Sequence, residues 1–163
     1  MKQQEIQLGD LAKDKITGFT GVVVTAVVFN ASVPRLGLQP RELGEGGYVR
    51  SKEYFDINQL ELVTPKVIEA SKLIKNPFKM LDTVKHTLTG FEGKVTSIVT
   101  WLNGCVRIGI QSTTFDKGKP VDDLAFPVQE IELLTTNTTK EKKRTGGDRL
   151  NPTEVKLAKG ADF

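Results

Sequence analysis

The chain has 163 residues, of which 38% are hydrophobic and 26% are charged. This composition is typical of a folded protein and excludes a fibrous or wholly disordered chain. No apolar run approaches the roughly 20 residues of a transmembrane helix, and the first residues lack the apolar stretch of a signal peptide. One cysteine, Cys105, and one histidine, His86, exclude an intrachain disulfide and argue against a zinc cluster. We therefore expect no metal, no cofactor and no membrane partner.

The formal net charge of +3 is concentrated near the C-terminal end of the sequence. Residues 135–163 contain 7 Lys or Arg and 4 Asp or Glu, whereas residues 1–134 contain 16 of each sign. A domain that binds double-stranded nucleic acid usually has a pronounced basic face. The neutral balance of residues 1–134 therefore does not favour such a domain, although it does not exclude one.

The sequence contains an internal repeat, in which residues 8–63 and 80–134 follow one pattern. A periodic chain is interpreted as repeated structural units, and two copies are too few for a solenoid. The matching pairs are Asp10 with Asp82, Lys13 with Lys85, Thr17-Gly18-Phe19 with Thr89-Gly90-Phe91, Gly21 with Gly93, Arg35 with Arg107, Gly37 with Gly109 and Gln39 with Gln111. We therefore predict that each copy encloses its own small core.

The longest predicted strand of each copy follows the repeated glycines. It covers Val22–Phe29 in the first copy and Val95–Trp101 in the second, and both segments are rich in β-branched residues. In the second copy, alternation predicts Val95 on one face of the strand and Ile98 on the other.

A hairpin is predicted after each long strand. Asn103-Gly104 is the strongest short hairpin signal, whereas the first copy has Asn30–Ser32 with Pro34 just after it, so we expect a looser turn there. The polar segments 40–52 and 112–123 predict surface loops. Short strands are then expected at Tyr54-Phe55, Ala125-Phe126, Leu60–Val63 and Ile131–Leu134.

About five short strands in each copy are typical of a small antiparallel barrel. Phe19 and Phe91 lie between two glycines in equivalent turns, and we expect both to be buried over one end of their barrel.

The segment between the copies predicts a helical connector. Pro65 can begin a helix, residues 70–75 are acceptable helix formers, and Asn76-Pro77 ends it. The apolar side chains of Val67, Ile68, Leu73 and Ile74 are expected to pack on the barrels.

After Leu134 the sequence becomes polar. No apolar residue occurs between Thr135 and Gly147, so this segment cannot fold alone. Asn151 and Pro152 could begin a short terminal helix that ends near Gly160, and such a helix would form only against a partner.

The string Gly-Asp-x-x-x-Asp-x-x-Thr-Gly-Phe-x-Gly, followed by a long strand and Asn-Gly-Cys-Val-Arg, resembles a family of small proteins of tailed bacteriophages. Residues 8–39 and 80–111 carry the pattern, and Thr145-Gly146-Gly147 fits the polar tail of that family. The unit is also similar, more loosely, to the KOW or SH3-like barrels of transcription and ribosomal proteins. The departures are Ala31–Pro34 in place of Asn-Gly-Cys-Val, and His86 and Leu81 in place of Asp14 and Gly9.

The resemblance implies a phage source, a barrel fold and no catalysis. Together with the connector and the arm, the expected fold is all-β, with two tandem small SH3-like barrels joined by a short helical connector and followed by an extended C-terminal arm. The predicted segments are a first barrel at 1–63, the connector at 64–79, a second barrel at 80–134 and the arm at 135–163.

No enzyme signature is found in the sequence, and we expect a protein without enzymatic activity. His86 and Cys105 could in principle form a base and a nucleophile. However, His86 matches Asp14 on an expected polar strand face, and Cys105 matches Val33 in a strand, so we favour structural roles for both. Gly44–Gly47 is not followed by Lys-Ser/Thr, which excludes a P-loop.

Several polar and aromatic residues leave alternatives open. Arg35 and Arg107 could bridge to a loop carboxylate or contact a partner. Trp101 is interpreted as a core residue rather than a platform for bases. The repeated charges Asp10, Lys13, Asp82 and Lys85 are interpreted as a solvated strand edge rather than a ligand-facing pair.

Partner binding is assigned from the sequence to the repeated arginines and to the arm. The Lys140–Arg144 cluster is interpreted as a solvated linker, with a phosphate contact as the alternative. The residues predicted to bind a partner are Arg35, Arg107, Lys142, Lys143, Arg144, Arg149 and Leu150.

Three functions are therefore compared. The leading hypothesis is a phage structural protein in the virion, made in the host bacterial cytoplasm, that decorates a capsid or lies at a head or tail interface. Its expected partner is another virion protein such as the major capsid protein. The alternatives are a KOW-like module that binds nucleic acid or modulates transcription, and a host-directed inhibitor or defence antagonist.

Overall fold

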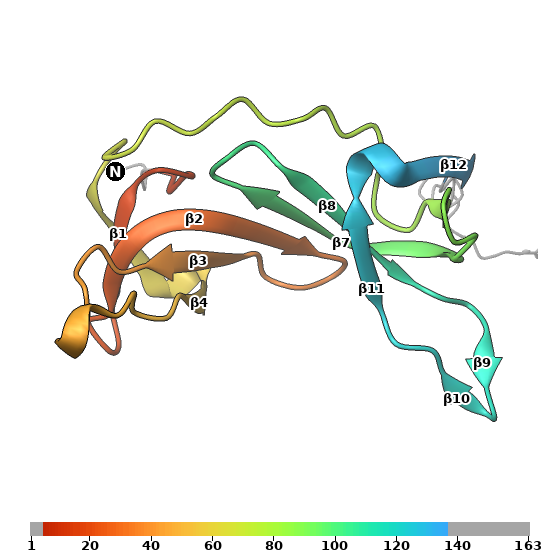
Figure 1. Cartoon of the computed structure of the whole chain (residues 1–163), viewed down its shortest axis with the longest axis horizontal. Helices are drawn as coiled ribbons and strands as arrows, with labels where there is room; N and C mark the ends of the chain where they lie inside the picture. Colours follow the sequence, from red (N-terminus) through yellow and green to blue (C-terminus); the bar gives the residue numbers. More distant parts are fainter. Residues whose placement is uncertain (1–4, 137–163) are drawn as a thin grey trace, which may run out of the picture.

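The fold of this chain is seen in a computed structural model that describes residues 5–136. These residues form an all-β structure with almost no helix, as the sequence predicts, and ten of their strands belong to one antiparallel sheet (Figure 1). No helix within residues 5–136 is long and apolar enough to cross a membrane. The arm beyond Thr136, including the predicted terminal helix, lies outside the described residues.

The first repeat contains five strands and two short 3₁₀ turns. They are β1 (Leu11–Asp14), β2 (Thr20–Phe29), β3 (Arg35–Gln39), η1 (Glu45–Gly47), β4 (Glu53–Asp56), η2 (Ile57–Gln59) and β5 (Leu60–Thr64). The strands pair in the order β5-β1-β2-β3-β4.

The second repeat follows the same plan with one added hairpin. Its elements are β6 (Thr83–His86), β7 (Glu92–Trp101), β8 (Val106–Gln111), β9 (Phe115–Asp116), β10 (Lys119–Pro120), β11 (Leu124–Pro127), η3 (Val128–Glu130) and β12 (Ile131–Thr135). The five equivalent strands pair in the order β12-β6-β7-β8-β11, while β9 and β10 form a separate hairpin. In neither repeat does the last strand pair with the strand before it, so each repeat is a curved, open sheet rather than a closed barrel.

Each repeat has its own hydrophobic core. In the first, Leu38 and Leu60 are fully buried, and in the second, Ile108 and Ile110 are fully buried. Phe19 packs against Phe55 with ring centroids 5.4 Å apart, and Phe91 packs against Phe126 at 5.8 Å. Phe19 and Phe91 are half-buried rather than fully buried, so they cover the edge of each core.

The two repeats are joined by direct pairing of their longest strands. Strand β2 pairs with β7 in antiparallel register, and Val27 lies opposite Val99. These two valines occupy equivalent positions in the repeat. On either side of them, Thr25 pairs with Trp101 and Phe29 pairs with Ser97, where Thr25 is equivalent to Ser97 and Phe29 is equivalent to Trp101. Val27 and Val99 therefore mark a local two-fold axis that relates the two repeats.

A β-bulge interrupts each long strand at the same place. The register shifts between Val23 and Thr25 in β2, and between Val95 and Ser97 in β7. The prediction that Val95 and Ile98 face opposite sides is wrong, because the extra residue changes the alternation and both side chains contact the same core.

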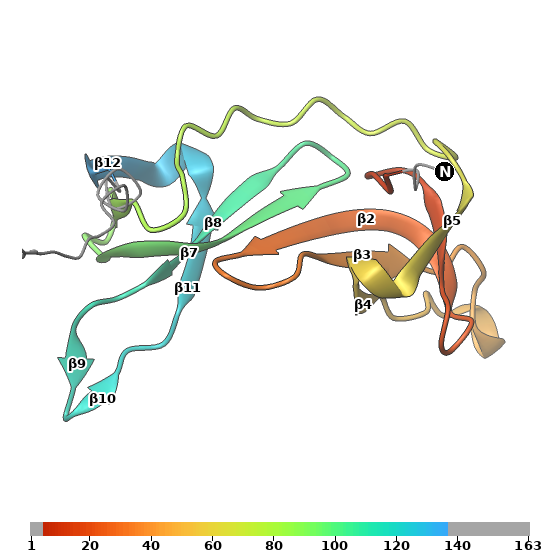
Figure 2. The ribbon, with the colours of Figure 1, turned by 180° about the vertical axis from the view of Figure 1, so that it is seen from behind.

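The connector between the repeats is extended, and the predicted helix is wrong (Figures 1 and 2). Its amides donate to carbonyls of the two repeats, Ile68 to Gly9 at 3.1 Å, Ser71 to Leu102 at 2.9 Å and Ile74 to Gly104 at 2.9 Å. These bonds replace the i to i−4 bonds of a helix, and Lys66 has a positive φ of 47° that no helix accommodates. The side chains of Ile68, Leu73 and Ile74 are 43%, 42% and 37% exposed, so they are less buried than expected.

Candidate partner-binding surfaces

The repeated arginines lie on the strands that follow the first hairpin of each repeat. Arg35 forms an ion pair with Asp56 at 3.1 Å and donates to the carbonyl oxygen of Tyr54 at 3.4 Å. Arg107 donates to the carbonyl oxygen of Ala125 at 2.7 Å. Both guanidinium groups therefore bind the neighbouring edge strand, which favours the structural alternative, and both residues keep an exposed surface.

The repeated aspartates at the start of the first strands are buried and structural. Asp10 accepts hydrogen bonds from the amides of Gln7 at 2.7 Å and Lys66 at 2.8 Å, and Asp82 accepts one from Lys79 at 2.9 Å. The expectation of a solvated edge is wrong for these two residues, because their carboxylates hold backbone amides that the sheet leaves unpaired.

The repeated lysines remain on the surface and pair across the strands. Lys13 lies 3.9 Å from Glu61, and Lys85 lies 3.6 Å from Glu132. All four side chains are at least a third exposed, so each pair contributes little to stability.

A buried polar side chain occupies the end of the first strand in both repeats. In the first, the backbone amide and hydroxyl of Thr17 donate to the Asp14 carboxylate at 2.8 and 2.6 Å, and this hydroxyl lowers the pKa of Asp14. In the second, the Nδ1 atom of His86 lies 2.7 Å from the hydroxyl of Thr89, and its Nε2 atom lies 2.8 Å from Glu130. The prediction of a polar strand face for His86 is wrong, since its side chain is buried.

The structure does not bring His86 and Cys105 together as a catalytic pair. Both ring nitrogens of His86 are bonded to Thr89 and Glu130, and the ring stacks on Phe126 at 3.9 Å. Cys105 is exposed in the turn before β8, and the expectation that it lies in a strand is wrong. Among residues 5–136, no group of three or more His, Cys, Asp or Glu side chains could hold a metal ion.

Trp101 lies at the junction of the repeats and is half-buried. The ammonium group of Lys52, from the first repeat, lies 4.3 Å from the ring centroid of Trp101, a cation–π distance. The neighbouring groove is also lined by Val24, Ile68 and Leu102, from both repeats and the connector. Trp101 therefore contributes to the contact between repeats.

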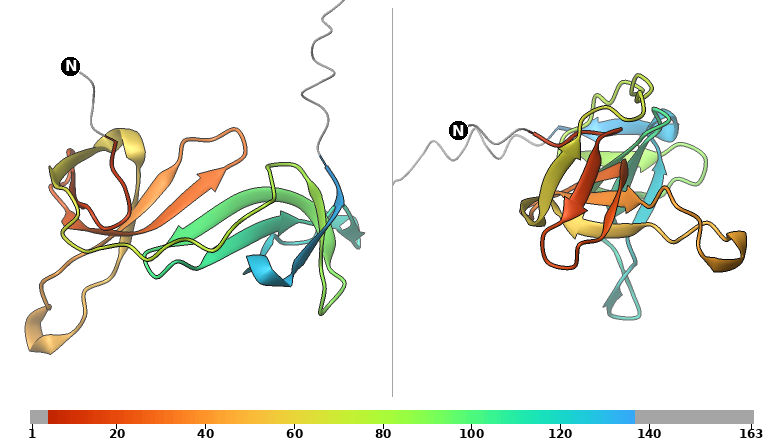
Figure 3. Two further views of the ribbon diagram at one scale, coloured as in Figure 1. Left: turned by 90° about the horizontal axis from the view of Figure 1, so that it is seen from above. Right: turned by 90° about the vertical axis from the view of Figure 1, so that its left-hand side faces the viewer.

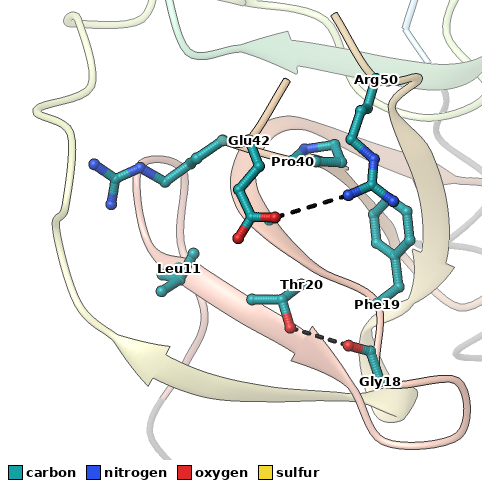
Figure 4. A pocket seen from close by; sticks show the side chains of 9 residues that line it. Leu11, Gly18, Phe19, Thr20, Pro40, Glu42 and Arg50 are labelled. Carbon is teal, nitrogen blue, oxygen red and sulfur yellow. Dashed lines mark hydrogen bonds and ion pairs between the residues drawn. The ribbon is translucent and has the colours of Figure 1, made fainter. Parts of the chain in front are cut away.

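A shallow pocket of about 350 Å³ lies between the β1–β2 turn and the loop after β3 (Figure 4). Phe19 and Pro40 line it together with Glu42 and Arg50, whose charged groups are 3.9 Å apart. The Glu42 and Arg50 side chains are 87% and 53% exposed, so water weakens their interaction. The pocket suits a protein contact better than an enclosed small molecule.

The surface loops that the sequence predicts project from their repeats (Figure 3). The first loop contains η1 and a bridge between Leu43 and Val49, and the second contains β9 and β10. Tyr48 and Val49 in the first loop are 74% and 76% exposed.

The remaining residues predicted to bind a partner, Lys142, Lys143, Arg144, Arg149 and Leu150, lie outside the described residues. The sequence reasoning missed the pairing of β2 with β7. The signal for it was the length of Val22–Phe29 and Val95–Trp101, because the β1–β2 and β6–β7 pairs use only the first residues of each long strand.

Comparison with known proteins adds no relative: no protein-family model matches the chain, and no curated protein matches it.

Proposed function

We propose that this chain is a non-enzymatic structural protein of a tailed bacteriophage, which decorates a capsid or lies at a head or tail interface. The observation that carries the proposal is the continuous sheet through both repeats, because the β2–β7 pairing fixes the distance and orientation between two equivalent units. A subunit that binds a repeating protein lattice needs such fixed spacing between its contact surfaces.

The fold of each repeat supports the finer part of this proposal. Five antiparallel strands enclose one core, and a 3₁₀ turn precedes the last strand in both copies. We assign each repeat to the SH3-like class in a form that is not closed. The binding surfaces would be exposed faces of the two repeats, together with the basic arm.

The alternative is a KOW-like nucleic-acid-binding module, and the junction gives it less support. Lys52 lies over one face of the Trp101 ring and competes with a stacked base there, and the repeated lysines Lys13 and Lys85 are paired with glutamates.

Mass spectrometry of purified virions tests the proposal directly. The protein should be present in washed particles, and the purified full-length chain should co-sediment with particles that lack it. Absence from virions together with capture of one bacterial protein would favour a host-directed factor. A steeply salt-dependent shift of DNA or RNA would favour the KOW-like alternative.

The same assay tests the arm with a variant that ends at Thr136, which keeps β12 whole. We expect weaker and less salt-sensitive co-sedimentation, because the arm holds the excess positive charge. Equal binding by both proteins would assign recognition to the folded repeats alone.

A further inference from the structure

Each outer end of the sheet carries an equivalent set of surface side chains, which we name the end faces. The first end face lies on β1, β5 and the β1–β2 turn, and the second lies on β6, β12 and the β6–β7 turn. The first comprises Lys13, Ile16, Glu61 and Val63, and the second comprises Lys85, Leu88, Glu132 and Leu134.

The backbone presents these side chains identically at both ends. Lys13 lies opposite Glu61 in the register of β1 and β5, and Lys85 lies opposite Glu132 in that of β6 and β12. Each strand pair shifts register two residues further along its last strand, at Val63 in β5 and Leu134 in β12. A bulge re-aims a side chain, and here it leaves an aliphatic residue exposed at both ends.

The turns add a second exposed aliphatic residue to each end face. Ile16 is 74% exposed and Leu88 is 77% exposed, whereas the neighbouring Thr17 and Thr89 form hydrogen bonds with the buried Asp14 and His86. The preceding buried position changed from Asp14 to His86 between the repeats, while the aliphatic residue at the tip was kept. The basis for a partner contact is therefore the recurrence of two exposed aliphatic residues, one in the turn and one in the last strand, at equivalent places in both end faces.

The charge of the end faces indicates a protein partner. Each repeated lysine is balanced by a glutamate within 4 Å, at 3.9 Å in the first face and 3.6 Å in the second, and the other lysine of the β1–β2 turn, Lys15, has Thr87 as its equivalent. A nucleic acid would need unpaired cations along its backbone. Two aliphatic side chains beside a neutral ion pair instead match the apolar and polar mixture of a protein interface.

We propose that the two end faces dock two copies of one protein subunit, so that the chain bridges neighbouring copies related by two-fold symmetry. The pairing of Val27 with Val99 makes the two faces equivalent by a local two-fold axis, and it places them at opposite ends of one sheet. This inference rests on the proposed structural function, and it specifies which residues bind and how many partner copies each chain engages.

The test uses the full-length chain, phage particles that lack it, and the exposed substitutions Ile16→Ser and Leu88→Ser. Each single variant should lose about 100-fold in apparent affinity for the particles, because two linked contacts become one. The two losses should be similar, and the double variant should not co-sediment measurably. Val49→Ser is the matched control, since Val49 is 76% exposed in the first loop, and it should bind as the unmodified chain does.

Thermal unfolding of each variant should match that of the unmodified chain, because the substituted side chains are exposed. Unchanged binding by the double variant, a loss from only one single variant, or an equal loss from Val49→Ser would each overturn the inference while leaving the proposed function intact. Failure of the unmodified chain to bind the particles would overturn both.

Discussion

The two repeats stabilise the same turn with different side chains. At the end of β1, the Asp14 carboxylate accepts two hydrogen bonds from Thr17, and at the end of β6, His86 binds the equivalent Thr89. The His86 ring also reaches Glu130, which occupies the place of Gln59 in the first repeat. The threonine is present in both turns, whereas its partner is Asp14 in the first repeat and His86 in the second. The turn therefore requires a buried hydrogen-bonding side chain rather than a particular charge.

The two sides of the local two-fold axis differ more sharply, because the connector passes along only one of them. It approaches Gly9 and Gly104 so closely that an added Cβ would lie 2.1 Å from the carbonyl oxygen of Ile68 and 2.5 Å from that of Lys72. The equivalent residues on the other side are Leu81 and Ser32, which already have a Cβ. A segment that followed the equivalent path on the other side would clash with the side chains of Leu81 and Ser32. The glycines on the first side therefore make room for the connector.

The largest expected effect comes from cross-linking the two repeats at the axis. Val27→Cys with Val99→Cys, in a Cys105→Ser background, should form a disulfide, because the bonds from Asn30 to Thr96 and Leu102 to Val24 make this a non-hydrogen-bonded pair. Closing such a long loop should raise the free energy of unfolding by about 4 kcal/mol.

Thiol titration would measure disulfide formation, and denaturant unfolding would measure the gain in the free energy of unfolding. Val28→Cys with Val99→Cys is the control, because Val28 lies opposite Ile98 and faces the other side of the sheet. Cross-linking of the control as readily as the test pair would contradict the register.

The second prediction compares the two cores at equivalent buried positions. Leu38→Ala and Ile110→Ala should each lower the free energy of unfolding by about 3 kcal/mol, because both side chains are fully buried. Urea unfolding followed by both circular dichroism and tryptophan fluorescence would show whether the repeats unfold together. A loss below about 1 kcal/mol in either variant would mean that its repeat lacks the core described here.

The third prediction concerns the side of the axis that carries the connector. Gly9→Ala should cost about 3 kcal/mol, because the new methyl group would meet the backbone of Ile68. Gly18→Ala is the matched control, since Gly18 also has a positive φ but has open space around its Cβ position. Its cost should be only the roughly 1 kcal/mol of the left-handed conformation. Equal losses in the two variants would show that the connector is not held against Gly9.

The smallest expected effect is a pH dependence of stability that arises from Asp14 at the β1–β2 turn. The pKa of Asp14 is lowered by its hydrogen bonds, so the unfolded chain binds a proton more readily than the folded chain. This contribution to stability is present above the unfolded value of about 3.9 and is lost as pH falls through the folded pKa. Asp14→Asn should therefore flatten the fall in stability below about pH 4, relative to the exposed control Asp122→Asn. An unchanged acid slope in Asp14→Asn would contradict this role.

The sequence predicts the all-β class and most strand positions because those features follow from local pattern. Repeated glycines, β-branched runs and Asn103-Gly104 are short-range signals, and the corresponding strands are present. Bulges are not visible in such patterns, because one extra residue in the ladder reverses the face of every following side chain. For this reason the facing of Ile98 was predicted incorrectly.

The connector and the buried polar groups depend on distant parts of the chain. Residues 70–75 have acceptable helix propensity, but carbonyls of Leu102 and Gly104 offer hydrogen bonds that only an extended segment can make. Asp10 is buried because it accepts a bond from Lys66, 56 residues away in sequence. Long-range partners of this kind cannot be deduced from the spacing of residue types alone.

The pairing of β2 with β7 has a consequence for behaviour on dilution. Two separate chains joined through equivalent edges would dissociate as their concentration falls, whereas edges within one chain meet at an effective concentration of about millimolar. The junction therefore forms in a single molecule, independent of how many copies are present. Because both repeats belong to one chain, each repeat can also change independently of the other. Gly9 of the first repeat is equivalent to Leu81 of the second, a difference that a symmetric pair of identical chains could not contain.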